Sequence, residues 1–116
     1  MTEKYLKLAL NDPKIIGPGY WTSWHRKTLH ATTKQKKKEA VRSIAIDIAN
    51  FPCSKCRFHA TKYCTEISPL GKSLESDDPL SVFYWTVDFH NFVNKRLDKI
   101  IIPRDAAILM WRDENV

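Results

Sequence analysis

The segment that follows Asp78 constrains the fold more than any other part of the chain. Its apolar residues recur at helical spacing on two opposite sides of one helix, and such a helix is buried on both sides. We expect it to run from the Asp78-Pro79 start signal to about Lys99, covered on one side by the core and on the other by a cofactor or a second subunit. The side that we expect to be the core stripe begins with Leu80, Phe83, Tyr84 and Val87, and the opposite side carries Val82, Trp85, Phe89, Phe92 and Val93.

The first of these two sides becomes polar toward its end. It continues as His90, Asn91 and Asn94. Buried side chains that can form hydrogen bonds need partners, because leaving them unpaired costs free energy. Something outside this helix must therefore supply those partners.

Helical spacing also describes the rest of the chain, in which Gly is scarce (three residues) and no strand-like alternation persists. The sequence predicts an all-α fold with four long helices and a short fifth. Residues 68–78 are rich in Ser, Gly and Asp, which is typical of a surface loop. We expect the first helix to run from Gly17-Pro18-Gly19 to about Thr32, with Pro18 near its first position. The second should cover about 36–51, the third should run from the cysteine motif to about Ile67, and the short last helix should begin near Pro103.

The second helix has one apolar face, formed by Val41, Ile44, Ile48 and Phe51. Its start is rich in lysine, and we expect Lys37 to point toward water. The formal net charge of the chain is +6. Because a lysine run of this kind is typical of a solvated helix start, the charge does not by itself indicate a nucleic-acid partner.

The length of 116 residues suits a single domain over 1–116, with its core at about 17–110. No apolar run approaches the roughly 20 residues that a membrane-spanning helix needs. The N-terminal sequence MTEKYLKLALNDPK has an apolar patch that is too short for a secretory signal and is interrupted by charge. We therefore expect a cytosolic protein with no signal peptide and no transmembrane segment.

Three cysteines, Cys53, Cys56 and Cys64, are present. An odd number that includes a CxxC motif argues against a secreted disulfide scaffold and favours redox or metal chemistry. Pro52 ends one helix, so the CxxC pair starts the next, where free backbone N–H groups and the helix dipole favour a thiolate. Lys55 and Arg57 add positive charge, which further predicts lowered cysteine pKa values.

Other interpretations of these cysteines remain open. Cys53, Cys56, His59 and Cys64 have ligand types that suit a structural zinc site. However, Cys64 lies two turns beyond Cys56 if residues 53–64 form one helix, which is too far for a shared ion. A thioredoxin-like fold needs strands around the motif, and the pair could also be incidental. A helical setting favours redox chemistry.

Three segments together carry a resemblance to a known family. They are GPGYWTSWH at 17–25, FPCSKCRFH at 51–59 and YWTVDFHNFVNKRLDK at 84–99. In these segments and their order, the chain resembles the Erv/ALR family of FAD-linked sulfhydryl oxidases, particularly the short single-domain members of large DNA viruses. Each segment alone is a modest match, whereas HNxVNxxLxK with an upstream CxxCxxH is highly specific.

This resemblance implies a four-helix bundle with a short fifth helix and FAD at one mouth of the bundle. It implies that Trp21 and His25 pack against the flavin, that Trp85 stacks on the adenine, and that Lys99 offsets phosphate charge. No metal is implied. The full set of implied FAD-binding residues is Tyr20, Trp21, His25, His59, Trp85, His90, Asn91, Val93, Asn94, Leu97 and Lys99.

The resemblance also implies a mechanism. A substrate dithiol attacks a Cys53–Cys56 disulfide, with Cys53 as the outer, interchange cysteine. Cys56 faces the isoalloxazine and passes electrons to it, and oxygen is the final acceptor, giving hydrogen peroxide. Family members are usually homodimers. A viral origin would place the protein in the host cytoplasm and in the virion.

The chain departs from the family pattern in four places. Val87 stands where many members have a cysteine of a structural disulfide. No second cysteine pair is present to shuttle electrons, which favours a thioredoxin- or glutaredoxin-like protein as the direct electron donor. His30 stands where cellular relatives often have an aromatic residue. Cys64 is unmatched, and we expect a buried free thiol or an intersubunit disulfide there.

Overall fold

The computed structural model describes residues 13–112, and the secondary structure in that range is entirely helical. The expected all-α fold with a short last helix is therefore confirmed. A short π-helix, η1 (Tyr63–Ile67), continues α4, and a 3₁₀-helix, η2 (Leu70–Leu74), precedes α5. The α-helices are α2 (Pro13–Leu29), α3 (Lys34–Ala49), α4 (Ser54–Lys62), α5 (Ser81–Arg96) and α6 (Arg104–Trp111).

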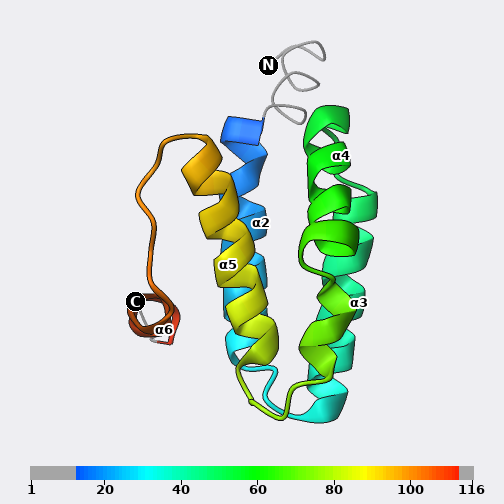
Figure 1. Cartoon of the computed structure of the whole chain (residues 1–116), viewed down its shortest axis with the longest axis vertical. Coiled ribbons are helices and arrows are strands. Elements are labelled where there is room, and N and C mark those ends of the chain that lie inside the picture. The colour runs from blue at the N-terminus through cyan, green and yellow to red at the C-terminus, as the bar shows by residue number, and fades with distance from the viewer. Residues whose placement is uncertain (1–12, 113–116) are drawn as a thin grey trace, which may run out of the picture.

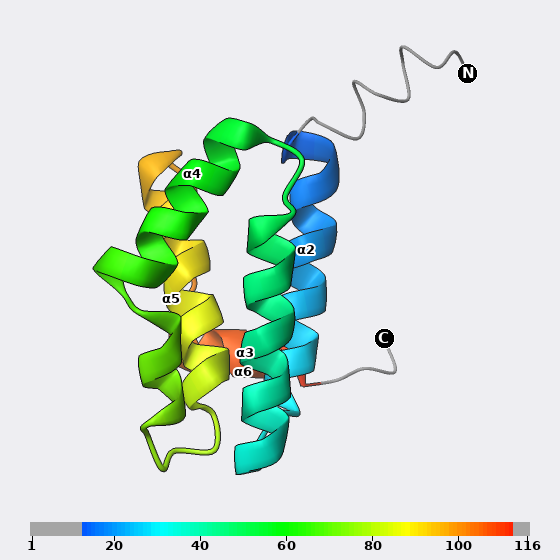
Figure 2. The same cartoon turned by 90° about the vertical axis from the view of Figure 1, so that its right-hand side faces the viewer.

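The first four of these helices form a bundle. α2 packs against α5 and α3, and α3 packs against α4 (Figure 1). α6 packs against α2 and α5 and lies below the level of α4 in both Figure 1 and the turned view of Figure 2. Within residues 13–112, no helix is both long enough and apolar enough to cross a membrane.

α5 contributes to two separate hydrophobic clusters. Val82, Trp85 and Phe89 pack in the main core with side chains of α2, α3 and η1, while Phe83 and Val87 pack with α6. The side with Phe83 and Val87, which we expected to be the core stripe, is therefore covered over its first turns by α6 and not by the main core. The opposite side, which we expected to meet a cofactor or a second subunit, lies in the main core at Val82, Trp85 and Phe89.

α6 is tied to α5 at three points. The side chain of Asn91 donates to the carbonyl of Ile102 at 2.6 Å and accepts from its N–H at 2.9 Å. The guanidinium of Arg104 donates to both carboxylate oxygens of Asp88, at 3.1 and 2.6 Å. Ala107 is buried between the helices. These contacts bring Trp111, at the end of α6, back toward α2.

The observed start of α2 differs from the expected one. The helix includes Pro13, so Pro18 lies inside it and not near its first position. A proline removes one backbone hydrogen bond, and α2 continues past that gap to Leu29, where it ends before the expected Thr32. The segment for which we expected no signal peptide lies largely outside the described residues.

α3 begins at a side-chain cap, since the hydroxyl of Thr33 accepts a hydrogen bond from the backbone N–H of Lys36 at 3.2 Å. Lys37 was expected to point toward water, but it is 5% exposed. Its ammonium donates to the carbonyls of Ser76 and Asp78. The carbonyl of Asp78 also accepts from the N–H of Ser81 at 3.1 Å. The two carbonyls give the ammonium hydrogen-bond acceptors, which explains why a buried lysine is stable there.

The end of α5 is set by a residue with left-handed backbone geometry. Asp98 has φ 57°, and the N–H of Lys99 donates to the carbonyl of Asn94 at 2.7 Å. Together with the bond from the N–H of Asp98 to the carbonyl of Lys95, this pattern is a Schellman motif. It ends the helix at Arg96, before the expected Lys99.

The loop before α5 is partly structured. Residues 70–74 form η2, and Leu70 is 5% exposed in the main core. α5 begins at Ser81 with Leu80 as its N-cap and no side-chain cap, so the expected cap at Asp78 and the first-turn position of Pro79 were wrong. The carboxylate of Asp78 instead accepts from the N–H of Leu80 at 2.9 Å, in the turn just before the helix. The loop therefore packs on the bundle more closely than a solvated surface loop would.

Candidate active site

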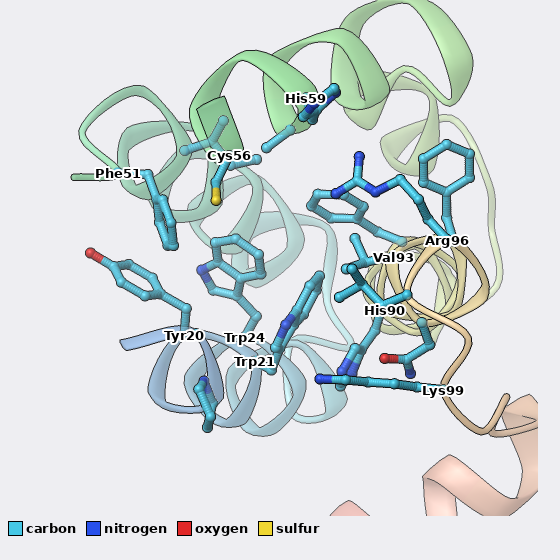
Figure 3. A pocket seen from close by; sticks show the side chains of 18 of the residues that line it. Tyr20, Trp21, Trp24, Phe51, Cys56, His59, His90, Val93, Arg96 and Lys99 are labelled. Atoms are coloured by element: carbon cyan, nitrogen blue, oxygen red, sulfur yellow. The ribbon is translucent and has the colours of Figure 1, made fainter. Parts of the chain in front are cut away.

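A cavity of about 510 Å³ opens where α2 and α4 begin and α5 ends (Figure 3). Its lining is mostly aromatic and aliphatic, and its two permanently charged lining residues, Arg96 and Lys99, are both cationic. A cavity with these properties suits a flat apolar ligand that also carries negative charge. The aromatic lining consists of Tyr20, Trp21 and Trp24 from α2, Phe51 from the turn before α4, Phe89 and Phe92 from α5, and Trp111 from α6.

The two cysteines of the CxxC motif occupy different places around this cavity. Cys53 caps the N-terminus of α4, where its Sγ accepts from the backbone N–H of Cys56 at 3.3 Å. Cys56 lies in the first turn and lines the cavity, and its sulfur points toward the aromatic side chains of α2 (Figure 3). The guanidinium of Arg57 stabilises the preceding turn, because it donates to the carbonyl of Phe51 at 2.8 Å.

The protonation of the two thiols differs accordingly. The hydrogen bond from the Cys56 side chain, helped by backbone N–H groups and the charge of Lys55, lowers the pKa of Cys53. Burial against the cavity, together with the neighbouring Cys53, raises the pKa of Cys56 to about 11. The expected lowering is confirmed for Cys53 and wrong for Cys56, because desolvation outweighs the helix terminus there.

The four residues of the possible zinc site do not converge. Among residues 13–112, no three side chains of His, Cys, Asp or Glu lie close enough together to hold a metal ion. Cys64 lies in η1, beyond the end of α4, and its Sγ donates to the carbonyl of Thr61 at 3.4 Å. The geometry therefore gives the zinc interpretation no support.

Stacked rings form the α2 wall of the cavity. The ring of Trp21 lies 4.1 Å from the ring of His90, with an angle of 5° between their planes. Phe51 packs on Tyr20 with ring centroids 4.8 Å apart. Trp24 anchors this wall to α3, because its indole N–H donates to the carboxylate of Asp47 at 2.8 Å.

Two hydrogen-bonded histidines adjoin this wall, with His90 in the cavity lining and His25 behind it. His25 is 2% exposed, and its Nε2 lies 2.9 Å from Nδ1 of His90. Burial, then the neighbouring His90, lowers the pKa of His25 to about 3. Burial, then the charge of Lys99, lowers the pKa of His90 to about 4. Both rings are therefore neutral near pH 7.

Most of the cofactor-binding residues expected from the sequence line the cavity. Asn94 is notable among them because its side-chain amide forms no hydrogen bond with the described part of the chain, although the residue is only 8% exposed. That amide is therefore available to a ligand. The expected residues in the lining are Tyr20, Trp21, His59, His90, Val93, Asn94, Leu97 and Lys99.

Three expected residues do not line the cavity. His25 lies behind His90, and Asn91 is engaged with Ile102. Trp85 was expected to stack on an adenine, but it is 5% exposed in the core, where its indole N–H donates to the carbonyl of Ser68 at 2.8 Å. These side chains position their neighbours and are not open to the cavity.

Several lining residues were not expected from the sequence. Phe51 was assigned to the core face of α3, but α3 ends at Ala49 and Phe51 turns to the cavity. Arg96 lies at a variable position of the HNxVNxxLxK motif, so the motif gave no indication of its role. Trp111 reaches the cavity only through the packing of α6, which no local pattern predicts.

Comparison with known proteins gives a consistent result. Residues 18–112 match the Erv1 / Alr family. An FAD-linked sulfhydryl oxidase of African swine fever virus is 39% identical over 89 residues, covering 74% of this chain and 71% of that protein. A putative FAD-linked sulfhydryl oxidase of Invertebrate iridescent virus 6 is 33% identical over 109 residues, covering 87% of this chain and 96% of that protein.

Proposed function

The chain belongs to the Erv1/Alr family, and from this membership we propose that it is an FAD-linked sulfhydryl oxidase that makes disulfides from thiols with oxygen as the acceptor. The observation that carries the proposal is the position of Cys56. This cysteine is half of a CxxC pair and also part of the lining of an aromatic, cationic cavity.

The residues around the cavity fit FAD. The rings of Trp21, Trp24 and Phe51 offer flat apolar surfaces to an isoalloxazine or adenine ring. Arg96 and Lys99 offer positive charge to the pyrophosphate. We propose the FAD-binding set as Tyr20, Trp21, His59, His90, Val93, Asn94, Leu97 and Lys99, supported from behind by His25 and Asn91.

The two cysteines have different roles in the thiol exchange. A substrate thiolate attacks Sγ of Cys53 in the Cys53–Cys56 disulfide, which forms a mixed disulfide and releases the Cys56 thiolate. A second substrate thiolate then displaces Cys53, which releases the substrate disulfide and leaves the pair reduced. Cys53 suits the outer role because its lowered pKa makes it a good leaving group in that second step. Bound FAD supplies the two-electron link from the reduced pair to oxygen, which gives hydrogen peroxide.

We propose a thioredoxin- or glutaredoxin-like thiol protein as the electron donor. Cys53 caps α4 outside the cavity lining and is partly exposed, so a partner sulfur can approach it. The sequence has no second CxxC pair to relay electrons. A homodimer in the host cytoplasm or virion is proposed from the viral relatives and from exposed apolar side chains such as Phe58, which is 65% exposed.

Oxygen uptake with dithiothreitol tests the function. We expect the purified protein to consume oxygen and the Cys56→Ser variant to lose this activity, because no sulfur then faces the cofactor. Cys64→Ser is the matched control, since Cys64 is partly buried but lies outside the cavity lining, and its rate should equal that of the unchanged protein. Full oxygen uptake by Cys56→Ser would contradict the proposal.

A further inference from the structure

A chain of hydrogen bonds connects the core of the bundle to the cavity. It begins at the hydroxyl of Thr86, whose Oγ1 lies 3.1 Å from Nδ1 of His25. Nε2 of His25 lies 2.9 Å from Nδ1 of His90, and His90 lines the cavity beside Trp21 and Lys99 (Figure 3). Since Thr86 is 0% exposed, these contacts connect a fully buried hydroxyl to a ring that a ligand would touch.

The single hydroxyl proton of Thr86 sets the direction of this chain. The hydroxyl donates to the carbonyl of Phe83 at 2.7 Å, the shortest of its contacts. The nearby hydroxyl of Thr28 is also committed, because it donates to the carbonyl of Trp24 at 2.7 Å. With the proton of Thr86 assigned to this shortest contact, neither hydroxyl has a proton left for His25, and Nδ1 of His25 then carries the proton and donates to Thr86.

The protonation of His25 then determines that of His90. A neutral imidazole has one N–H, so Nε2 of His25 is an acceptor and Nδ1 of His90 is the donor to it. The remaining nitrogen of His90, Nε2, therefore carries a lone pair. Nε2 of His90 forms no hydrogen bond with any described residue. Every buried side-chain nitrogen and oxygen among those residues does have a partner, so this nitrogen is not buried but open to the cavity.

We propose that Thr86 is a positioning residue that makes Nε2 of His90 a hydrogen-bond acceptor in the cavity, where it selects a hydroxyl or amino hydrogen of the bound nucleotide. This proposal rests on the proposed FAD binding and adds a specific contact to it. A phosphate oxygen at this nitrogen would bring two lone pairs face to face. Lys99, which lies beside His90, is the residue that suits the phosphates.

Nitrogen-15 NMR of the FAD-loaded, histidine-labelled protein tests the protonation directly, because the ¹⁵N shifts show which ring nitrogen carries the proton. We expect Nδ1–H in both His25 and His90. Thr86→Val keeps the side-chain shape but removes the acceptor, and both rings should switch to Nε2–H. Thr86→Ser restores the hydroxyl and should restore the original pattern.

Thr28→Val is the matched control. Thr28 is as buried as Thr86, at 0% exposed, and its hydroxyl lies 3.4 Å from that of Thr86, but it makes no side-chain contact with the ring of His25. The control removes the same kind of buried hydroxyl and should leave both rings unchanged. Nε2–H rings in the unchanged protein, or rings that stay Nδ1–H in Thr86→Val, would overturn the proposal.

Cofactor affinity gives the second measurement. Thr86→Val should weaken FAD binding roughly tenfold, the order of one hydrogen bond, while Thr28→Val and Thr86→Ser should bind as the unchanged protein does. Equal losses of FAD affinity in Thr28→Val and Thr86→Val would overturn the proposed hydrogen bond between His90 and the nucleotide. The same comparison with FMN in place of FAD locates the donor hydrogen. If Thr86→Val still weakens FMN binding, the hydrogen lies on the flavin half of the nucleotide. If Thr86→Val binds FMN as the unchanged protein does, the hydrogen lies on the adenosine half.

The two proposals can fail separately. A protein that purifies without flavin and binds none would contradict the proposed function. The ring protonation would then be read from a nitrogen-15 spectrum of the flavin-free protein, so the effect of Thr86 on His25 and His90 would be judged on its own.

Discussion

Cys53 and Cys56 are three residues apart and have the same side chain, but their thiols differ in pKa because their surroundings differ. Both lie at the start of α4, but only Cys56 turns into the cavity. Helix N-termini stabilise thiolates, whereas apolar surroundings destabilise them. The first effect dominates at Cys53 and the second at Cys56, so the reduced pair loses its first proton from the outer sulfur.

Alkylation of the reduced protein with iodoacetamide checks this difference, because only the thiolate reacts. The rate at Cys53 should rise with pH around a midpoint below the ordinary value of 9.0, and the rate at Cys56 around a midpoint near 11. Peptide mapping by mass spectrometry assigns each rate to its cysteine, with Cys64 as an internal comparison. Faster labelling of Cys56 than of Cys53 at pH 8 would show that the roles are reversed.

At the scale of elements, Lys37 connects α3 to the turn before α5. Its ammonium binds two backbone carbonyls there, and its stem is buried. Lys37→Met keeps the stem length but leaves both carbonyls without this donor. The loss of these hydrogen bonds from a charged group should lower the free energy of unfolding by about 1–3 kcal/mol.

Urea unfolding measures this loss, and Lys38→Met provides the control. Lys38 is the next residue of the same helix and is exposed, so its substitution should change the free energy of unfolding by less than about 0.5 kcal/mol. Equal effects of the two substitutions would show that Lys37 does not hold the turn.

The helices themselves were predictable because their apolar residues repeat at helical spacing. Their ends were less so. The Schellman turn at Asp98 depends on one residue with positive φ, and that residue is not the glycine that usually marks such a turn. The burial of Lys37 depends on carbonyls about forty residues later in the chain, which no local pattern contains.

The site was predictable to the extent that its residues belong to motifs. Trp21, Cys56, His90 and Lys99 were expected and line the cavity. Trp85 belongs to the same motif region, but its indole N–H finds a partner in Ser68 and the ring stays in the core. Arg96 and Trp111 were missed because their positions depend on how α5 ends and how α6 packs.

For the whole molecule, the buried histidine pair makes stability depend on pH. The pKa values of His25 and His90 in the folded chain, about 3 and about 4, lie below the ordinary value of 6.5. The unfolded chain therefore binds more protons than the folded chain between pH 4 and 6.5. Stability should be fully present above that window and fall as the pH falls through it.

Urea unfolding at pH 7, 6 and 5 checks this dependence. Each proton taken up only by the unfolded chain lowers the free energy of unfolding by up to about 1.4 kcal/mol per pH unit. We expect a continuous loss below pH 6.5 from these two rings. Constant stability from pH 7 to pH 5 would contradict the lowered pKa values of these two rings.

The central claim is that the cavity beside Cys56 holds FAD, and the absorbance spectrum of the purified chain tests it most directly. We predict a yellow protein with about one FAD per chain, whose visible absorbance is bleached by dithiothreitol without oxygen and returns when oxygen is admitted. A colourless protein that neither contains nor takes up flavin, and that loses its fold when a metal chelator is added, would contradict the claim.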